Sequence, residues 1–271
     1  MRCLSQSMAT NMDRIRVHRL FDEMKCDYSM VVPTSTDRAR VHDATGIPMR
    51  NLVASGVPNG DLYQLTLVRR WMFEHLIDDG QKYLIVNDNV SGLFQVDPIY
   101  YEGREKLSEW KDVWSRDDRD AIYRTRCLDP LAKVHELFDK MTEWGTVLAG
   151  VGGIENFFFR EYKWSYRNLV RGDFFVGRKD GGPIDPGPEC PTWDDWFHSL
   201  DVLDRYGRVA INRWLTAIKP ACEPGGLGPE RERGEAKRLA AAWLARRFPH
   251  IVRISPTNER ALQIRRGKWR R

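Results

Sequence analysis

The chain has 271 residues, of which 42% are hydrophobic and 30% charged, and its formal net charge is only +5. This composition argues against a disordered chain, and no apolar segment approaches the roughly 20 residues that a membrane span needs. The N-terminal residues contain no continuous apolar segment of the kind that a secretory signal has. The five cysteines are odd in number and lack C-x-x-C spacing, which argues against a disulfide framework or a zinc site. We therefore expect a folded protein of a reducing cytoplasm.

The first third of the chain alternates between short apolar segments and one longer periodic segment. Residues 1–27 are polar and charged and predict a lead-in, with one helix over 12–25. Short strands are predicted over 30–32 and 50–55, and apolar residues at helical spacing predict a helix over 62–76. Four apolar or aromatic residues, 83–86, predict a buried strand. This alternation favours an α/β fold with a mixed, mostly parallel sheet flanked by helices.

The rest of the chain continues the pattern with longer interruptions. The sequence predicts a loop-helix insertion over 97–127 and an amphipathic helix over 129–145. It then predicts strands over 146–151 and 172–178, a helix over 192–207 and a strand over 208–218. A Gly- and Pro-rich stretch, 219–229, is the best candidate for a linker, and a helix over 231–247 and two short strands follow it. We therefore expect a main domain over 28–220 and a small basic α+β appendage over 221–271.

Asn87, Asp88 and Asn89 directly follow the predicted strand 83–86. A divalent cation bound to a diphosphate needs only one or two oxygen ligands from the protein, which Asp88 and Asn89 can supply. The alternative is that three short polar side chains form a turn after a strand, which is common.

A second polar segment, residues 34–38, follows the predicted strand 30–32 as a loop. Thr34, Thr36 and Arg38 offer hydroxyls and a guanidinium, which suit the ribose and phosphates of a nucleotide. Ligands of open α/β sheets bind beyond the carboxyl ends of the strands, so this segment and the Asn87–Asn89 triplet should face one crevice. An ordinary hydroxyl-rich loop is the alternative, and neither G-x-G-x-x-G nor G-x-x-x-x-G-K-[ST] occurs in the chain.

Asp194 and Asp195 open the predicted helix 192–207 beside aromatic residues. A carboxylate next to aromatic residues can have its pKa raised and act as a general base. Helix capping and interaction with the helix dipole explain the same two acids without any catalysis.

Aromatic and basic residues are interleaved in "NFFFREYKW", residues 156–164. Such a segment can hold a flipped or single-stranded base, or a sugar ring, and its candidate contacts are Asn156, Arg160, Lys163 and Trp164. A core strand with its turn is the alternative for most of the phenylalanines.

The chain closes on the basic sequence "IRRGKWRR". Clustered cations create a local positive field that favours nucleic acid, and the candidate contacts here are Arg265, Arg266 and Lys268. A solvated basic tail explains the same residues.

The order of these segments resembles that of the GT-A class of nucleotide-sugar glycosyltransferases, over roughly residues 28–220. It looks closest to the phage enzymes associated with TET/JBP-type hydroxylases, which glycosylate hydroxylated bases in DNA. The resemblance implies a UDP- or GDP-sugar donor, a manganese or magnesium ion, and an acceptor such as a hydroxymethyl base of phage DNA in the host cytoplasm.

The resemblance also assigns roles to residues. Asn87, Asp88 and Asn89 take the position of the Asp-x-Asp motif, and Asp194 or Asp195 takes that of the base of an inverting enzyme. Thr34, Thr36, Arg38 and Arg70 take the nucleotide-binding positions. The chain departs from the pattern in having one carboxylate rather than two in the triplet, and Asp-Asp rather than Glu-Asp in the late acidic pair. The first departure puts strict metal dependence in doubt, and the second leaves the identity of the base open by one residue.

Other classes of protein fit the same residues. A nucleotidyltransferase would use a similar sheet and metal site, and a nucleic-acid-binding protein without turnover would explain the basic tail and the weakened acidic motif together. A glycosyltransferase acting on protein is a further alternative.

Overall fold

The computed structural model describes residues 1–9, 12–57, 63–97, 99, 101, 125–152, 161–190, 192, 194–219 and 230–265. Its main feature is an eight-stranded sheet with the order β3-β2-β1-β4-β8-β6-β9-β7. The strands are β1 (Arg2–Gln6), β2 (Tyr28–Val32), β3 (Leu52–Ala54), β4 (Lys82–Asn87), β6 (Leu148–Val151), β7 (Trp164–Ser165), β8 (Phe174–Arg178) and β9 (Ala210–Asn212). All run parallel except β8, which is antiparallel to β4 and β6, and β7, which is antiparallel to β9.

Two small antiparallel sheets accompany the main one. One pairs β5 (Gly92–Gln95) with β10 (Leu215–Ile218), and the other pairs β11 (Val252–Ser255) with β12 (Asn258–Ile264). The helices are α1 (Val17–Glu23), α2 (Ser35–Thr45), α3 (Gln64–His75), α5 (Pro130–Glu143), α6 (Asp194–Tyr206) and α7 (Glu230–Arg247), with short 3-10 helices at Met12–Arg14 and Met49–Asn51. None of the helices in the described part of the chain has both the length and the apolar character needed to cross a bilayer.

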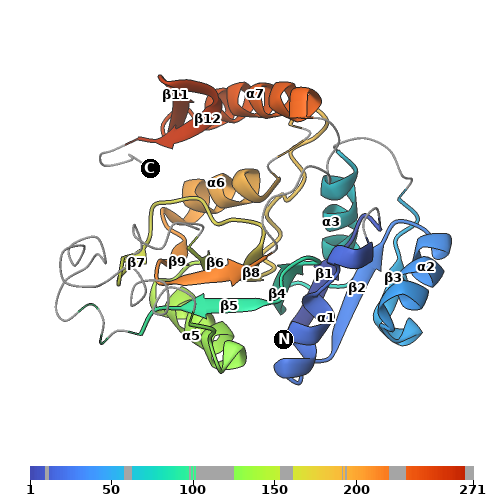
Figure 1. The fold of residues 1–271 in the computed structure, drawn as a ribbon. Helices are drawn as coiled ribbons and strands as arrows, with labels where there is room; N and C mark the ends of the chain where they lie inside the picture. Colours follow the sequence, from blue (N-terminus) through green and yellow to red (C-terminus); the bar gives the residue numbers. More distant parts are fainter. Residues whose placement is uncertain are drawn as a thin grey trace.

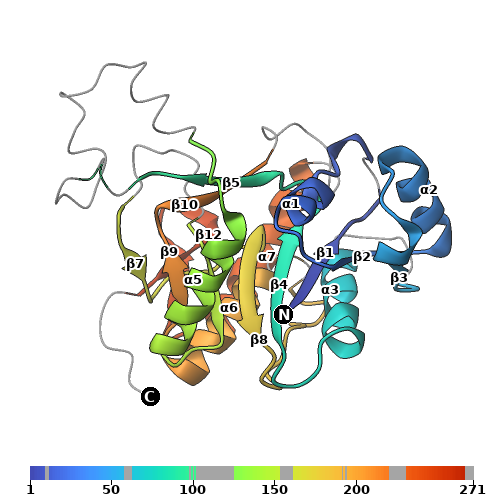
Figure 2. The same ribbon diagram turned by 90° about the horizontal axis from the view of Figure 1, so that it is seen from below.

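Helices cover both faces of the main sheet, because successive strand residues point to opposite sides. In β4, Leu84 and Val86 pack on the side of α1 and α5, whereas Tyr83 and Ile85 pack on the side of α3 and α6. Figure 1 shows these layers edge-on, with α5 below the sheet and α6 above it, and Figure 2 shows the same arrangement from below. The prediction of an α/β fold with a mixed, mostly parallel sheet flanked by helices is confirmed.

The N-terminal segment forms β1, an interior strand of the main sheet, whereas the sequence predicts a polar lead-in for these residues. β1 pairs in parallel with both β2 and β4. The prediction that residues 1–27 precede the sheet is therefore wrong for 2–6. Only Cys3 and Leu4 are apolar in this strand, and its end buries the polar residues Ser5 and Gln6, so no apolar segment reveals it in the sequence.

Residues 34–38 form the start of a helix rather than the predicted loop. The Thr34 side chain caps α2 by accepting a hydrogen bond from the Asp37 amide (3.1 Å), and its hydroxyl donates to Asp37 Oδ2 (2.7 Å). A Thr followed three residues later by an acid is a capping pattern, so the sequence did contain this signal.

The predicted strand 208–218 divides into β9 and β10, which belong to different sheets. The side-chain oxygen of Asn212 accepts hydrogen bonds from the amides of Trp214 and Leu215, both at 3.1 Å. This side chain substitutes for a strand partner and turns the chain out of the main sheet.

The C-terminal part has the predicted α+β character and packs on α6. The rings of Trp243 and Phe248 lie 5.8 and 6.0 Å from that of Phe197 in α6, and Phe248 is 1% exposed. Figure 1 shows α7 and the β11–β12 hairpin stacked on α6, on the side away from the sheet. The expected linker residues 220–229 lie outside the described residues, so the boundary near 220 stays a prediction.

Because Phe248 is buried with the core of the main sheet, we expect Phe248→Ala to lower the free energy of unfolding of the whole protein by about 3–5 kcal/mol. Ile254→Ala, at a side chain that is 39% exposed on the hairpin, is the matched control and should cost less than about 1 kcal/mol. Denaturant unfolding measures both. Separate unfolding of the C-terminal part, before the sheet, would contradict this packing.

Candidate functional site

Polar side chains gather at one edge of the main sheet. The carboxyl ends of the parallel strands meet at this edge, and the antiparallel strand β8 begins there. The residues at these strand ends are Gln6 and Ser7 after β1, Thr34 after β2, Asn87 to Asn89 after β4, Gly152 after β6, and Gly172 and Asp173 before β8. The carboxyl edge of an open α/β sheet is the usual position of a ligand site.

The Asn87–Asn89 triplet forms a turn with its main-chain atoms. The amide of Val90 donates to the Asn87 carbonyl (3.1 Å). The Asp88 carbonyl accepts from the amides of Arg16 (2.7 Å) and Val17 (3.0 Å), at the start of α1. The turn predicted as the alternative to a metal site is therefore present, and it uses main-chain atoms of Asn87 and Asp88.

The side chains of Asp88 and Asn89 are the ones that the sequence predicts as metal ligands. Burial raises the pKa of Asp88 from 3.8 to about 6, although a hydrogen bond from Ser7 opposes the shift. Among the described residues, the side-chain oxygen of Asn89 is buried without a hydrogen-bond partner, which is rare for a polar atom. A carboxylate and an orphaned amide oxygen fit a divalent cation that takes its other ligands from phosphate and water.

The described residues contain no group of three His, Cys, Asp or Glu side chains that could hold a metal ion by themselves. A manganese or magnesium ion at Asp88 and Asn89 would thus take its remaining ligands from phosphate oxygens or water, and the site stays a prediction.

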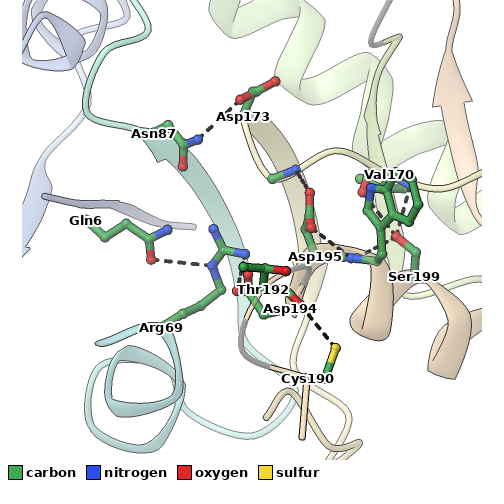
Figure 3. A network of polar contacts seen from close by, with 12 residues as sticks. Gln6, Arg69, Asn87, Val170, Asp173, Cys190, Thr192, Asp194, Asp195 and Ser199 are labelled. Carbon is green, nitrogen blue, oxygen red and sulfur yellow. Dashed lines mark hydrogen bonds and ion pairs between the residues drawn. The ribbon is translucent and has the colours of Figure 1, made fainter. Parts of the chain in front are cut away.

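Asp194, the first residue of α6, forms a buried ion pair. Its carboxylate contacts the Arg69 guanidinium from α3, and the two side chains are 7% and 5% exposed. The Nε of Arg69 also donates to the Gln6 side-chain oxygen at the end of β1 (3.4 Å). The Arg69 guanidinium thus links α3 to the start of α6 and to the end of β1 (Figure 3).

Among the described residues, no cation lies at hydrogen-bond distance from Asp195, which is held mainly by amides. One carboxylate oxygen accepts from the amide of Gly172 (2.7 Å) and the other from that of Trp196 (2.9 Å). Burial and the neighbouring Asp194 raise the pKa of Asp195 from 3.8 to about 6, while Arg69 opposes the shift. Asp194 is thus the ion-paired carboxylate, and Asp195 is the one with a general base's pKa.

The segment Gly172–Asp173 joins the acidic pair to the triplet. The Asn87 side-chain amide donates to Asp173 Oδ1 (3.2 Å), and the Asn87 backbone amide donates to the Asp173 carbonyl (3.0 Å). A Cβ atom at Gly172 would lie 3.1 Å from the Asp195 Cβ and 3.2 Å from Arg69 Nη2, so glycine allows this close approach. Two predicted sites that are more than 100 residues apart in sequence therefore form one polar network (Figure 3).

Other predicted nucleotide-binding residues have structural partners. Thr34 caps α2, and Thr36 is exposed in its first turn. Arg38 donates to the carbonyl of Met49 (2.8 Å). Arg70 is half exposed and pairs with Glu74 and Asp185, whereas its neighbour Arg69 enters the polar network. Contacts of these four residues with a nucleotide stay a prediction.

The predicted acceptor residues are described only in part. Trp164 packs in an aromatic cluster, with its ring 5.4 Å from that of Trp214, and Lys163 lies 3.5 Å from Glu161. Arg265 is exposed at the end of the hairpin, where its Nε donates to the Val252 carbonyl (3.3 Å). Asn156, Arg160, Arg266 and Lys268 lie outside the described residues.

Sequence reasoning missed the roles of Gln6, Arg69 and Asp173. Gln6 belongs to an unrecognised strand, and Asp173 precedes a strand whose reversed direction no local pattern reveals. For Arg69 the sequence contains one signal. It directly follows the apolar Val68, so helical spacing places it near the side of α3 that faces the core.

No model of a known protein family matches the chain, and a search of curated proteins likewise finds no match.

We expect Asp194→Asn to lower the free energy of unfolding by about 3 kcal/mol, because it leaves the Arg69 guanidinium buried without its counter-charge. Chemical denaturation at neutral pH measures this loss.

Asp195→Asn should change the pH dependence of stability, because it removes a carboxylate whose charged form is disfavoured by burial, while it also leaves one of the two donating amides without an acceptor oxygen. The unfolded chain releases the Asp195 proton near pH 3.8 and the folded chain near pH 6, so wild type loses stability relative to the variant as the pH rises between these values. The stability of the variant relative to wild type should therefore be highest above pH 6 and lowest below pH 3.8. A relative stability that does not change with pH in this window would show that the unpaired carboxylate is wrongly assigned.

Proposed function

We propose that this protein is a nucleotide-sugar-dependent glycosyltransferase of the GT-A type. The observation that supports the proposal most is the single polar network at the carboxyl edge of the sheet, in which Gly172 and Asp173 connect the triplet after β4 to the acidic pair of α6. A mixed, mostly parallel sheet with helices on both faces is compatible with such a fold. The position of the network is where such a sheet binds ligands.

In this proposal Asp195 is the general base. Its carboxylate takes the proton of the acceptor hydroxyl, whose oxygen forms a bond to the anomeric carbon of the sugar. The bond from that carbon to the diphosphate breaks, and the nucleoside diphosphate leaves with the electron pair. The raised Asp195 pKa and the two amides that fix its oxygens support this role. Arg69 and Asp194 act as positioning residues behind it.

The diphosphate of the donor would lie at the triplet. Asp88 and Asn89 would hold a manganese or magnesium ion there, which when bound offsets the charge that develops on the leaving diphosphate. Asn87 is held against Asp173, which keeps the triplet adjacent to the acidic pair. A UDP- or GDP-sugar meets these requirements equally well.

The acceptor class that we propose is a hydroxylated base of DNA, such as a hydroxymethyl base made in phage-infected cytoplasm. A base in a duplex must be flipped out before its hydroxyl can reach a carboxylate, which costs a few kcal/mol. Stacking side chains and cations can offset this cost. The chain offers both in the exposed Tyr162 and Tyr166, with Lys140 over the Trp164 ring at 5.5 Å, and in the basic C-terminal part.

A nucleic-acid-binding protein without turnover is the second candidate. It is favoured by one observation, that the main-chain atoms of Asn87 and Asp88 already make a turn and cap α1. In that case the triplet would need no ligand. The two candidates differ in whether a nucleotide stabilises the protein.

A thermal-shift panel of UDP, GDP and their sugars, each with and without manganese, tests the donor site. A millimolar ligand with a Kd of about 10 μM should stabilise the protein by roughly 2.7 kcal/mol. Asp88→Ala should remove the metal-dependent part of the shift, whereas Asp43→Ala, at an exposed residue of α2, should not. A flat panel combined with binding to hydroxymethylated DNA would rule out the transferase and favour the second candidate.

Turnover should depend on pH through Asp195. We expect kcat/KM with a hydroxymethylated oligonucleotide to rise as the pH increases through about 6, because only the deprotonated carboxylate accepts the acceptor's proton. Asp195→Asn should abolish turnover and retain the nucleotide-induced thermal shift. A variant that keeps turnover with an unchanged pH profile would exclude Asp195 as the base.

A further inference from the structure

The C-terminal part of the chain carries far more positive charge than the rest. Residues 230–271 contain thirteen lysines and arginines against four acids, a formal charge of +9, whereas the whole chain carries only +5. The residues before them therefore sum to −4. A charge asymmetry of this size within one chain favours an anionic partner for the basic part.

The acids of this part lie at one end of it. Among the described residues 234–265 the acids are Glu235 and Glu259. Glu235 pairs with Arg238 in the first half of α7 (2.6 Å). This hydrogen bond raises the pKa of Arg238, and the charge of Glu259 adds to the shift, so Glu259 lies at the same end.

Four arginines lie at the opposite end. Arg246 and Arg247 close α7, and β11 begins after a short turn with Arg253 as its second residue. The amide of Arg265 donates to the Ile251 carbonyl (2.8 Å), which places Arg265 beside the start of β11. All four arginines are exposed, and only Arg265 is a contact predicted from the sequence. This end belongs to the α7 and β11–β12 part that lies away from the main sheet in Figure 1.

Two of these arginines are held in place by uncharged groups. The Nε of Arg253 donates to the Gln263 side-chain oxygen (3.0 Å), and the Arg247 guanidinium lies 5.1 Å from the centre of the Phe248 ring. Within the described part of the chain, the ion pairs of this region are those of Arg238 and His250, and no carboxylate pairs with Arg246, Arg247 or Arg253. Ordered guanidinium groups with their full charge lose little side-chain freedom when they bind an anion.

The outer face of the hairpin is polar. Val252 and Ile264 pack inward against the core, so alternation along the strands places Arg253, Gln263 and Arg265 together on the outer face. Peripheral membrane proteins insert large apolar side chains into the bilayer, and these three residues offer none. The face therefore favours a nucleic acid over an anionic membrane.

The surface also favours a duplex over a single strand. Proteins that bind single strands stack the bases on aromatic rings. The described aromatic side chains of residues 234–265, Trp243 and Phe248, pack against Phe197 of α6 instead. Arginine binds two phosphate oxygens at once, and a duplex presents phosphates at close and regular spacing.

We propose that Arg246, Arg247, Arg253 and Arg265 form a docking surface for the phosphate backbone of double-stranded DNA. This surface goes beyond the proposed function, because it requires neither a sugar donor nor a hydroxylated base. The choice of DNA over duplex RNA alone rests on the proposed function, whose acceptor is DNA. Bound in this way, a DNA duplex would stay on the protein whatever its bases are.

Fluorescence anisotropy with a short unmodified DNA duplex, the full chain and no donor tests the surface over a series of salt concentrations. Each phosphate contact contributes about 0.9 to the slope of log K against log salt, which is roughly eight-fold in affinity at about 0.1 M salt. Arg253→Gln should therefore lower the slope by about 1 and weaken binding roughly eight-fold. The double variant Arg246→Gln/Arg247→Gln should lower the slope by about 2 and weaken binding roughly sixty-fold.

The matched control is Glu235→Gln/Arg238→Gln. It removes an exposed guanidinium from the same helix together with its paired carboxylate, so the net charge is unchanged. The control should bind the duplex with the affinity and slope of wild type. Thermal unfolding of every variant, compared with wild type, verifies that these exposed substitutions leave the fold intact.

Absence of duplex binding by wild type, or equal slopes for wild type and both charge-removing variants, would overturn the proposal. So would tighter binding to a single strand of the same length, to duplex RNA, or to vesicles of anionic lipid. Absence of sugar transfer, with duplex binding and its loss in the variants as expected, would contradict the proposed transferase and leave the docking surface standing.

Discussion

The buried ion pair between Arg69 and Asp194 is the interaction on which the polar edge of the sheet depends. A guanidinium in the interior is tolerated only when carboxylates and hydrogen-bond acceptors surround it, and here Asp194 and Gln6 do so. The pair fixes the first turn of α6 against α3 and the end of β1. It also creates an asymmetry between two adjacent acids, because the charge that Arg69 neutralises on Asp194 is not neutralised on Asp195. The chemistry available at this edge follows from that asymmetry.

The rest of the edge shows the same use of polar groups in the interior. Ser5, Gln6 and Ser7 are at most 3% exposed at the end of β1, where apolar side chains would pack more favourably. Gly172 brings a loop within contact distance of Asp195 and Arg69. Burial of so many polar groups lowers stability and is therefore expected only where a site requires it. The two apolar faces of the sheet, with α1 and α5 on one side and α3 and α6 on the other, provide the compensating stability.

Local patterns in the sequence predicted the elements whose burial is periodic. The sequence predicts, close to their observed positions, the helices at 64–75, 130–143 and 194–206 and the strand at 82–87. The apolar residues of these helices repeat about every 3.6 residues, and those of the strand are consecutive. Residues 34–38 and the triplet were expected at one crevice for topological reasons, whereas the acidic pair was linked to the triplet only by the resemblance. Local patterns carry no information on the pairing of strands that are distant in sequence. The strand at 2–6 is specified by its neighbours, and the reversed direction of β8, which places Asp173 at the site, is decided by the whole sheet.

In the Asn87–Asn89 turn, the main chain and the side chain of Asp88 are subject to different constraints. At Asp88 the start of α1 is held by the carbonyl oxygen, which any amino acid supplies, while the proposed ligand chemistry would depend on the carboxylate. Natural variation at this position can therefore change what the edge binds while α1 and β4 remain in place. If the proposed function holds, a single substitution at this position would separate metal-assisted transfer from nucleic-acid binding, with the architecture of the sheet unchanged.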